Sequence, residues 1–139
     1  MAHKEYTTPL AKKLGIKEAA RVALVNAPPG AAKLLEPLPP GVELKTQARG
    51  KLDVIVLFSK KESEVAKRFP ALAKALVPDG RLWVAYPKKA AGVATDLTFE
   101  NVQQIGLDAG LVDNKSIAVD DTYSGVQFVY RIKDRPSKR

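Results

Sequence analysis

The chain has 139 residues, the length of one domain, and its 45% hydrophobic and 27% charged residues exclude a disordered protein. It has no cysteine and a single histidine, His3, which excludes disulfides and thiolate chemistry and argues against a histidine triad or multi-histidine metal site. The net charge of +8 favours anionic partners such as nucleic acid, phosphorylated ligands or acidic proteins.

The first thirty residues predict a short helix followed by a strand. Thr8 can cap the helix, Pro9 fits its first position, and Gly15 can end it. Apolar residues then recur in Arg21–Asn26, which we interpret as the first strand. This strand leads into a turn, Asn26–Gly30, that contains two prolines.

The second strand leaves two alternatives open. A short helical piece, Ala31–Glu36, is ended by prolines, and Val42–Leu44 begins a strand. Thr46–Lys51, which leads to the next strand, spans only about 20 Å when extended. A parallel pair requires the chain to return along the sheet. We therefore expect a short, parallel second strand, with an antiparallel edge strand as the alternative.

The segment Leu52–Phe58 is the strongest strand candidate. After Asp53 it is an unbroken apolar run that is rich in β-branched residues. A run of this kind suits a strand that is covered on both faces. We therefore predict a mainly parallel sheet with helices above and below it.

A long helix and a fourth strand follow. Ser59-Lys60-Lys61-Glu62 has the spacing of a capping box, which predicts a helix that starts at Lys60. Pro70 should kink or divide this helix. Pro78-Asp79-Gly80 predicts a turn, after which Arg81–Tyr86 forms the fourth strand.

The C-terminal third predicts a long loop, a helix and a hairpin. The loop is Pro87–Leu97, and Thr98 can cap the helix Phe99–Ala109. Two alternating stretches, Lys115–Val119 and Val126–Ile132, are joined by a polar turn that contains glycine, which is typical of an antiparallel hairpin.

Two sets of residues carry a resemblance to known families. Leu52–Leu57 and Leu76–Val84 resemble the fourth and fifth strands of a class I methyltransferase-type Rossmann domain. Thr8–Gly15, Tyr86–Lys89 and Thr122–Gly125 resemble a small bacterial family known only as a domain of unknown function (number 3052). The second resemblance implies no activity, because none is assigned to that family.

Pattern and resemblance together predict the fold class and the domain boundaries. We expect a three-layer, Rossmann-like α/β sandwich whose mainly parallel sheet has about six strands and ends in an antiparallel hairpin. Residues 1–132 form this single domain, and Lys133–Arg139 form a flexible basic tail. No stretch approaches the ~20 apolar residues of a membrane span, and the N-terminus lacks the apolar core of a signal peptide. We therefore expect a cytoplasmic protein.

The methyltransferase resemblance also implies features that this chain lacks. In that family, closely spaced glycines after the first strand and an acidic residue after the second strand bind S-adenosylmethionine. Asn26–Gly30 contains two prolines, which remove two N–H donors. Thr46–Arg49, after the second strand, contains no carboxylate. We therefore expect no S-adenosylmethionine bound in the usual mode and no other cofactor.

The candidate site lies at the carboxyl ends of the parallel strands, where open α/β sheets bind ligands. Basic side chains and the N-terminus of the helix at Lys60 could together hold a phosphate or carboxylate. The predicted anion-binding residues are four lysines and two hydrogen-bonding groups, Asn26, Ser59, Lys60, Lys61, Lys88 and Lys89. The alternative is that the lysines are ordinary exposed residues and that Ser59 only caps the helix.

Two classes of function remain open. The first is a non-catalytic binding or regulatory module for a small anionic ligand or nucleotide. The second is association with nucleic acid through the basic surface, with an affinity that falls steeply as salt is added. A divergent methyltransferase-like enzyme is a weaker alternative. No catalytic or metal-binding residue is predicted, because turn chemistry accounts for the acidic pair Asp120-Asp121.

Overall fold

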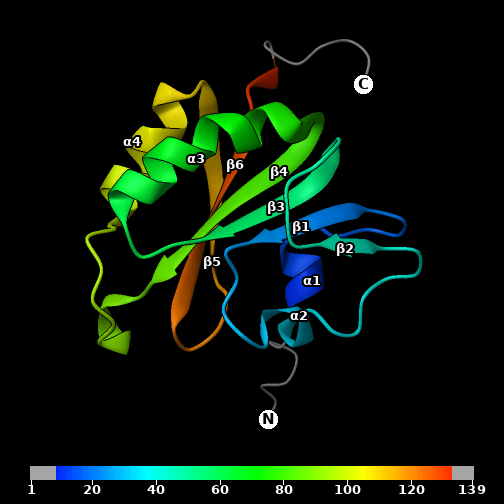
Figure 1. Ribbon diagram of the computed structural model, residues 1–139, viewed down its shortest axis with the longest axis horizontal. Helices are drawn as coiled ribbons and strands as arrows, with labels where there is room; N and C mark the ends of the chain where they lie inside the picture. Colours follow the sequence, from blue (N-terminus) through cyan, green and yellow to red (C-terminus); the bar gives the residue numbers. More distant parts are fainter. Residues whose placement is uncertain (1–8, 133–139) are drawn as a thin grey trace.

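The computed structural model describes residues 9–132 and shows a six-stranded sheet with helices on both faces (Figure 1). The strands are β1 (Arg21–Val25), β2 (Glu43–Lys45), β3 (Leu52–Phe58), β4 (Leu76–Pro87), β5 (Leu111–Ala118) and β6 (Tyr123–Tyr130). The helices are α1 (Leu10–Lys13), α2 (Ala31–Leu34), α3 (Glu62–Ala75), the 3-10 helix η2 (Lys89–Ala91) and α4 (Phe99–Asp108). The predicted three-layer α/β sandwich is confirmed, while Thr8 and the basic tail lie outside the described residues. The N-cap of α1 is Pro9, so the cap predicted at Thr8 was one residue too early.

The sheet has the order β2-β1-β3-β4-β6-β5. Its first four strands are parallel, and β6 pairs antiparallel with both β4 and β5. The second strand is short and parallel to β1, with Arg21 opposite Glu43, as we expected. The predicted C-terminal hairpin is confirmed, with β6 inserted between β4 and β5.

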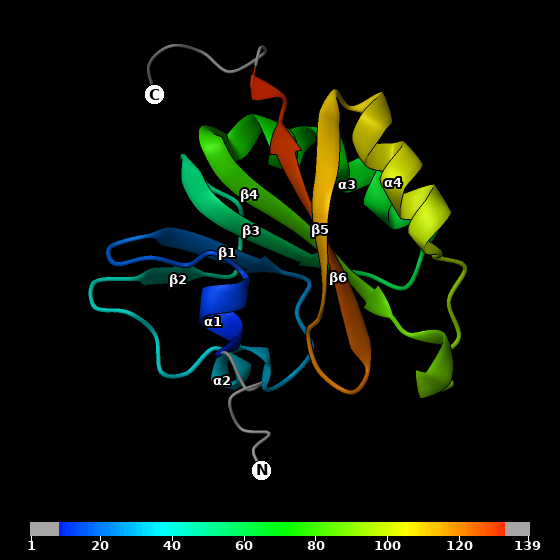
Figure 2. The same cartoon turned by 180° about the vertical axis from the view of Figure 1, so that it is seen from behind.

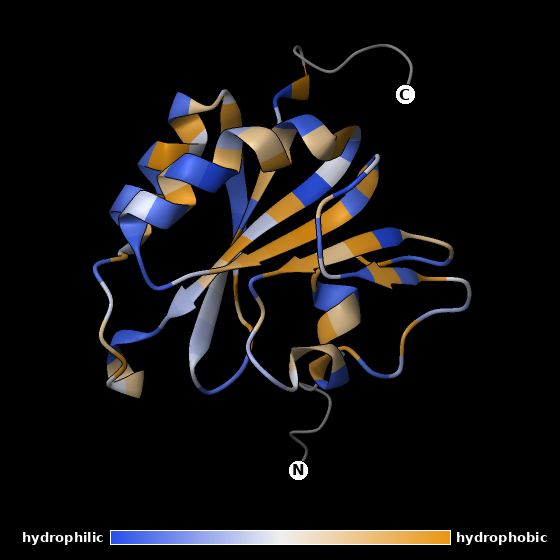
Figure 3. Ribbon diagram, viewed as in Figure 1, coloured by the Kyte–Doolittle hydropathy of each residue, from blue (hydrophilic) through white to orange (hydrophobic). Residues whose placement is uncertain are grey.

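Strand β3 begins and ends where the sequence predicts, and it lies between β1 and β4. All of its residues except Asp53 are buried. Ile55 and Leu57 pack into the core on one side of the sheet, and Val56 and Phe58 pack into the core on the other side. Burial on both faces explains why this segment has no polar alternation. The hydropathy colouring shows the same apolar band along β1 and β3 (Figure 3).

The two faces of the sheet are covered unequally. Helices α3 and α4 pack side by side over β3, β4 and β6 (Figures 1 and 2). The opposite face is covered by the much shorter α1 and α2 and their connecting loops. No helix within residues 9–132 has both the length and the apolar character needed to span a bilayer.

Helix α3 differs from its prediction in two respects. It begins at Glu62 with Lys61 as the N-cap, so the start predicted at Lys60 was too early. Ser59 and Glu62 do not form the capping box that their spacing predicts, because Lys61 has no side-chain capping bond and Ser59 bonds elsewhere. Pro70 lies inside the helix without dividing it.

The strand boundaries in the C-terminal half also differ from the predictions. The predicted turn Pro78-Asp79-Gly80 lies inside β4, which begins directly after α3 at Leu76. The pairing partners jump from Leu52↔Leu76 to Val54↔Arg81, so this segment bulges out of the sheet. Pro78-Asp79-Gly80 therefore forms a bulge instead of a turn, because pairing with β3 on both sides of it keeps the segment within β4.

The hairpin strands begin earlier than predicted. Leu111 already pairs with Tyr130, and Tyr123 to Gly125, which we assigned to the turn, belong to β6. In contrast, the capped helix after Thr98 is confirmed, because Thr98 and Asn101 form a reciprocal capping box. Ile132, which we placed in the last strand, is 81% exposed beyond its end.

Candidate functional site

A pocket of about 530 Å³ opens at the carboxyl ends of β1 and β3. It brings together four of the six predicted residues, because parallel strands end at the same edge of the sheet. These four are Asn26, Ser59, Lys60 and Lys61. The rest of its wall is formed by Ala27, Pro28, Pro29, Phe58, Glu64 and Tyr123.

Asn26 links the ends of the two strands. Its backbone has φ 58°, in the left-handed region that asparagine tolerates better than most residues. The side-chain Nδ2 of Asn26 donates to the carbonyl oxygen of Phe58 at 2.9 Å and to Glu64 Oε1 at 3.4 Å. Asn26 therefore shapes the pocket by joining β1, β3 and α3.

Ser59 is buried and holds the same carboxylate. Its hydroxyl donates to Glu64 Oε1 at 2.6 Å and accepts from the backbone N–H of Lys61 at 3.1 Å. Arg68 Nε lies 3.6 Å from the other oxygen, Glu64 Oε2. Sequence reasoning missed Glu64. Two signals were available in the sequence. Glu64 lies four residues before Arg68, a spacing that favours an ion pair on a helix. It also lies in the first turn of α3.

The N-terminus of α3 is capped by a residue from a distant loop. Asp96 Oδ1 accepts from the backbone N–H of Glu62 at 2.7 Å, and Thr95 Oγ1 donates to the carbonyl oxygen of Lys60 at 2.6 Å. A carboxylate at this position already interacts with the helix dipole. Asp96 therefore already satisfies one of the N–H groups that we expected this helix end to offer to a ligand.

Lys88 and Lys89 line a separate pocket of about 580 Å³ beyond the end of β4. They share it with Tyr86, Phe99 and Glu100. The two lysine pairs therefore do not face one common hollow, because the chain turns away after β4 to reach η2 and α4. Two acidic residues, Asp96 and Glu100, also line this second pocket and make it less favourable for an anion than its two lysines alone would be.

Tyr86 provides a pH-dependent test of this second pocket. Burial, and secondarily the Glu100 carboxylate, raise the pKa of Tyr86 above 10.0. The phenol is thus harder to ionise in the folded state. Its contribution to stability is complete below pH 10.0 and is lost as the pH rises through the folded pKa. We expect Glu100→Gln to lower the pKa of Tyr86 only partly, since burial remains, as measured by NMR titration of the tyrosine rings.

Tyr130 is the internal control for that titration. Burial alone raises its pKa. Glu100→Gln should therefore leave the pKa of Tyr130 unchanged. Equal movement of both tyrosines would contradict the assigned role of Glu100.

The first pocket combines an apolar wall with cationic side chains. Phe58 and Tyr123 form an edge-to-face pair with ring centroids 5.3 Å apart, and two prolines also line the pocket. Lys60 and Lys61 are exposed, and neither forms an ion pair within residues 9–132. In the same part of the chain, no three acidic or histidine side chains are placed to hold a metal ion. The pocket can thus hold an anionic group beside an apolar surface.

No family model and no curated protein matches the sequence, but solved structures match the fold. A SAM-dependent methyltransferase from Aquifex aeolicus gives a TM-score of 0.55 at 17% identity, over 90% of this chain and 95% of that chain. Magnesium protoporphyrin IX methyltransferase from Synechocystis PCC 6803, solved with bound SAM, gives 0.58 at 12% identity, over 92% and 77%. Aeropyrum pernix fibrillarin, in complex with S-adenosyl-L-methionine, gives 0.60 at 14% identity, over 86% and 73%.

These similarities confirm the Rossmann-like fold that the strand pattern predicted, with the methyltransferase-type topology that the resemblance implied. At such low identity they show the fold alone. The resemblance to the bacterial family of unknown function stays a prediction.

Proposed function

We propose that this chain is a cytoplasmic, non-catalytic binding or regulatory module that holds a small anionic ligand or nucleotide at the carboxyl ends of β1 and β3. One observation carries the proposal. Lys60 and Lys61 stand at a pocket of about 530 Å³, in the place where open α/β folds bind ligands, without an ion pair to another residue in 9–132.

The lining of the pocket supports a ligand with an anionic end and an apolar or ring-shaped body. Its volume lies within the range of about 300–1,000 Å³ that small-molecule sites occupy. The lysine ammonium groups suit a phosphate or carboxylate, and the Phe58–Tyr123 pair suits a flat or apolar group. A nucleotide combines both properties.

The same lining argues against S-adenosylmethionine bound in the mode of the structural neighbours. Pro28 and Pro29 form the loop after β1, and neither carries a backbone N–H. After β2, the hollow is lined by Lys45 and Arg49 and not by a carboxylate. Only the second difference favours a negatively charged ligand, because Lys45 and Arg49 are basic. The prolines remove N–H donors and so argue only against the usual binding mode.

Binding of nucleotides and sulfate should be lost when the lysine pair is removed. We expect the Lys60→Ala/Lys61→Ala variant to bind at least about tenfold more weakly, because each charge-assisted hydrogen bond contributes about 1.5–3 kcal/mol. Thermal shift against a panel of nucleotides and sulfate would identify the ligand class, and calorimetry would give the affinity.

A matched control is Lys67→Ala/Lys74→Ala, which removes two charges from the exposed side of α3. It should leave the affinity within about twofold, since neither residue lines the pocket. If Lys88→Ala/Lys89→Ala weakened ligand binding as much as Lys60→Ala/Lys61→Ala does, all four lysines would contribute to one site. Tight binding of oligonucleotides that disappears with salt would favour nucleic-acid association and contradict a small-ligand site.

A further inference from the structure

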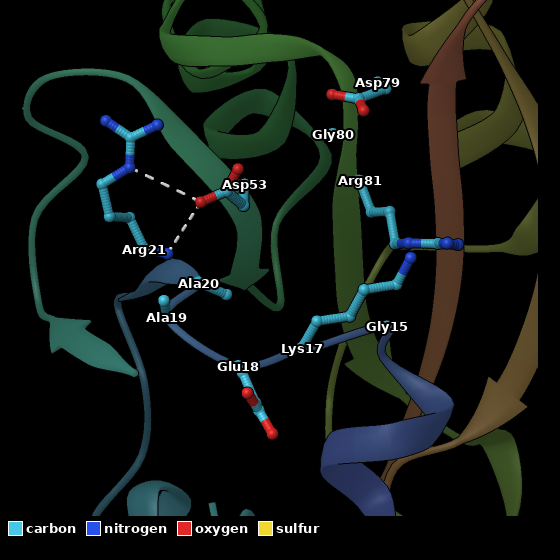
Figure 4. Close-up of a pocket in the computed structure, with 10 residues that line it drawn as sticks. All are labelled: Gly15, Lys17, Glu18, Ala19, Ala20, Arg21, Asp53, Asp79, Gly80 and Arg81. Atoms are coloured by element: carbon cyan, nitrogen blue, oxygen red, sulfur yellow. Dashed lines mark hydrogen bonds and ion pairs between the residues drawn. The ribbon is translucent and has the colours of Figure 1, made fainter. Parts of the chain in front are cut away.

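A third pocket, which is polar, lies at the opposite edge of the sheet, at the amino ends of β1 and β3 (Figure 4). Its volume is about 420 Å³. It is formed by the loop after α1, by Asp53 at the start of β3, and by the bulge that precedes Arg81 in β4. None of its residues lines the pocket at the carboxyl ends of the strands.

Arg81 is held in place within this pocket. Its Nη1 donates to Gln127 Oε1 at 3.2 Å, and Gln127, which is only 1% exposed, donates to Asn114 Oδ1 at 2.8 Å. The Arg81 side chain also lies directly over Gly15, where a Cβ atom would come closer than 3.0 Å to the guanidinium. The neutral amide of Gln127 and the absence of a side chain at Gly15 therefore position the half-buried guanidinium of Arg81.

Among residues 9–132, no carboxylate forms an ion pair with Arg81. Ion pairs within residues 9–132 join Arg21 to Asp53, Lys45 to Glu43 and Arg68 to Glu64. Asp53 is also bonded to the backbone of Arg21, whose N–H lies 2.8 Å from Asp53 Oδ2. Partial burial of a guanidinium against a neutral amide alone is unfavourable, so an anion from outside the chain would stabilise this arrangement.

Lys17 adds a second positive charge to the same wall. In Figure 4 the Lys17 and Arg81 side chains extend toward one another from the loop after α1 and from β4. Glu18 points away from them, and Asp79 lies on the far side of Gly80. Two cations that converge without a carboxylate between them form a site for an oxyanion, to which the guanidinium can present two parallel N–H groups.

We propose that Lys17 and Arg81 bind the carboxylate of a small organic acid at the amino edge of the sheet. The choice of a singly charged group follows from the rest of the lining. Three basic residues, Lys17, Arg21 and Arg81, are balanced by three acidic residues, Glu18, Asp53 and Asp79, so the lining as a whole is neutral. The second negative charge of a dianionic phosphate gains attraction from the three basic residues, but repulsion from the three carboxylates offsets that gain. A neutral lining therefore gives phosphate no advantage over a carboxylate.

An NMR titration tests this site directly. Sodium acetate, added at constant ionic strength, should shift the Arg81 Nε–H signal and the amide signals of Gly15, Lys17 and Gly80. The shifts should saturate with a dissociation constant of about 10 mM. Inorganic phosphate should bind no more tightly. Shifts that grow linearly without saturation, or phosphate binding tighter than acetate binding, would overturn the assignment.

Substitutions locate the binding and separate it from the first pocket. Lys17→Met should weaken acetate binding at least about fivefold, and because Lys17 is exposed this variant should fold normally. Arg81→Met should abolish binding while keeping the aliphatic contact with Gly15. Lys12→Met, which removes a nearby charge outside the pocket, is the control. Acetate binding that survives in both Lys17→Met and Arg81→Met would refute the site, whatever the Lys60→Ala/Lys61→Ala variant shows.

Discussion

Replacing Trp83 with alanine is expected to lower the free energy of unfolding by about 3–5 kcal/mol. The side chain is fully buried in the core beneath α1, and its indole N–H donates to the carbonyl oxygen of Leu14 at 3.0 Å. Alanine removes both the packing and this bond between α1 and the sheet. Because domains are stabilised by about 5–15 kcal/mol in total, the loss should be evident in urea unfolding. The measurement should use circular dichroism, since Trp83 is the only tryptophan.

Two further variants separate packing from hydrogen bonding. Trp83→Phe keeps an aromatic ring but leaves the Leu14 carbonyl without its donor, so we expect a smaller loss of about 1–3 kcal/mol. Phe99→Ala, which removes an aromatic side chain that is 37% exposed, should cost less than about 1 kcal/mol. If Trp83→Ala cost no more than Phe99→Ala, the packing of α1 against the sheet would be wrong.

The parts of the fold that could be predicted from the sequence are those with strong local patterns. Leu52–Phe58 was predicted to the residue because a strand buried on both faces must be apolar throughout. Thr98 was predicted as a cap from its residue type alone, and its capping bonds, which involve Asn101, lie within one helical turn. The start of β4 was missed because Pro78-Asp79-Gly80 has turn chemistry, and only pairing with β3 keeps it in the sheet.

The candidate site was partly predictable for a similar reason. Asn26 and Ser59 follow parallel neighbouring strands, so topology alone places them at one edge. Asp96 was not predictable as the cap of α3, because it comes from a loop 34 residues away. The contact between Gly15 and Arg81 was equally hidden, since the glycine has a sufficient local explanation as the end of α1. Contacts between distant loops leave no periodic signal in a single sequence.

Gly106→Ala is expected to destabilise the protein by about 2 kcal/mol, although alanine is the better helix former by about 1 kcal/mol. Gly106 is buried inside α4, and a Cβ atom there would come closer than 3.0 Å to the ring of Phe128 on β6. That ring is fully buried and packs edge-to-face against Phe69, with centroids 5.2 Å apart, so it has no room to move. The overpacking should therefore outweigh the gain in helix propensity. Urea unfolding of the variant gives the sign directly.

A double-mutant cycle shows whether the ring is the cause. Phe128→Leu alone removes part of the core and should be destabilising, but it also opens space opposite residue 106. Gly106→Ala should then cost much less in the Phe128→Leu background than in the wild type, with a coupling of about 1–2 kcal/mol. Gln104→Ala, on the exposed side of α4, is the control for helix propensity and should have little effect. A stabilising Gly106→Ala would mean that α4 does not approach β6 as closely as the structure shows. The packing of α4 on its face of the sheet would then be wrong.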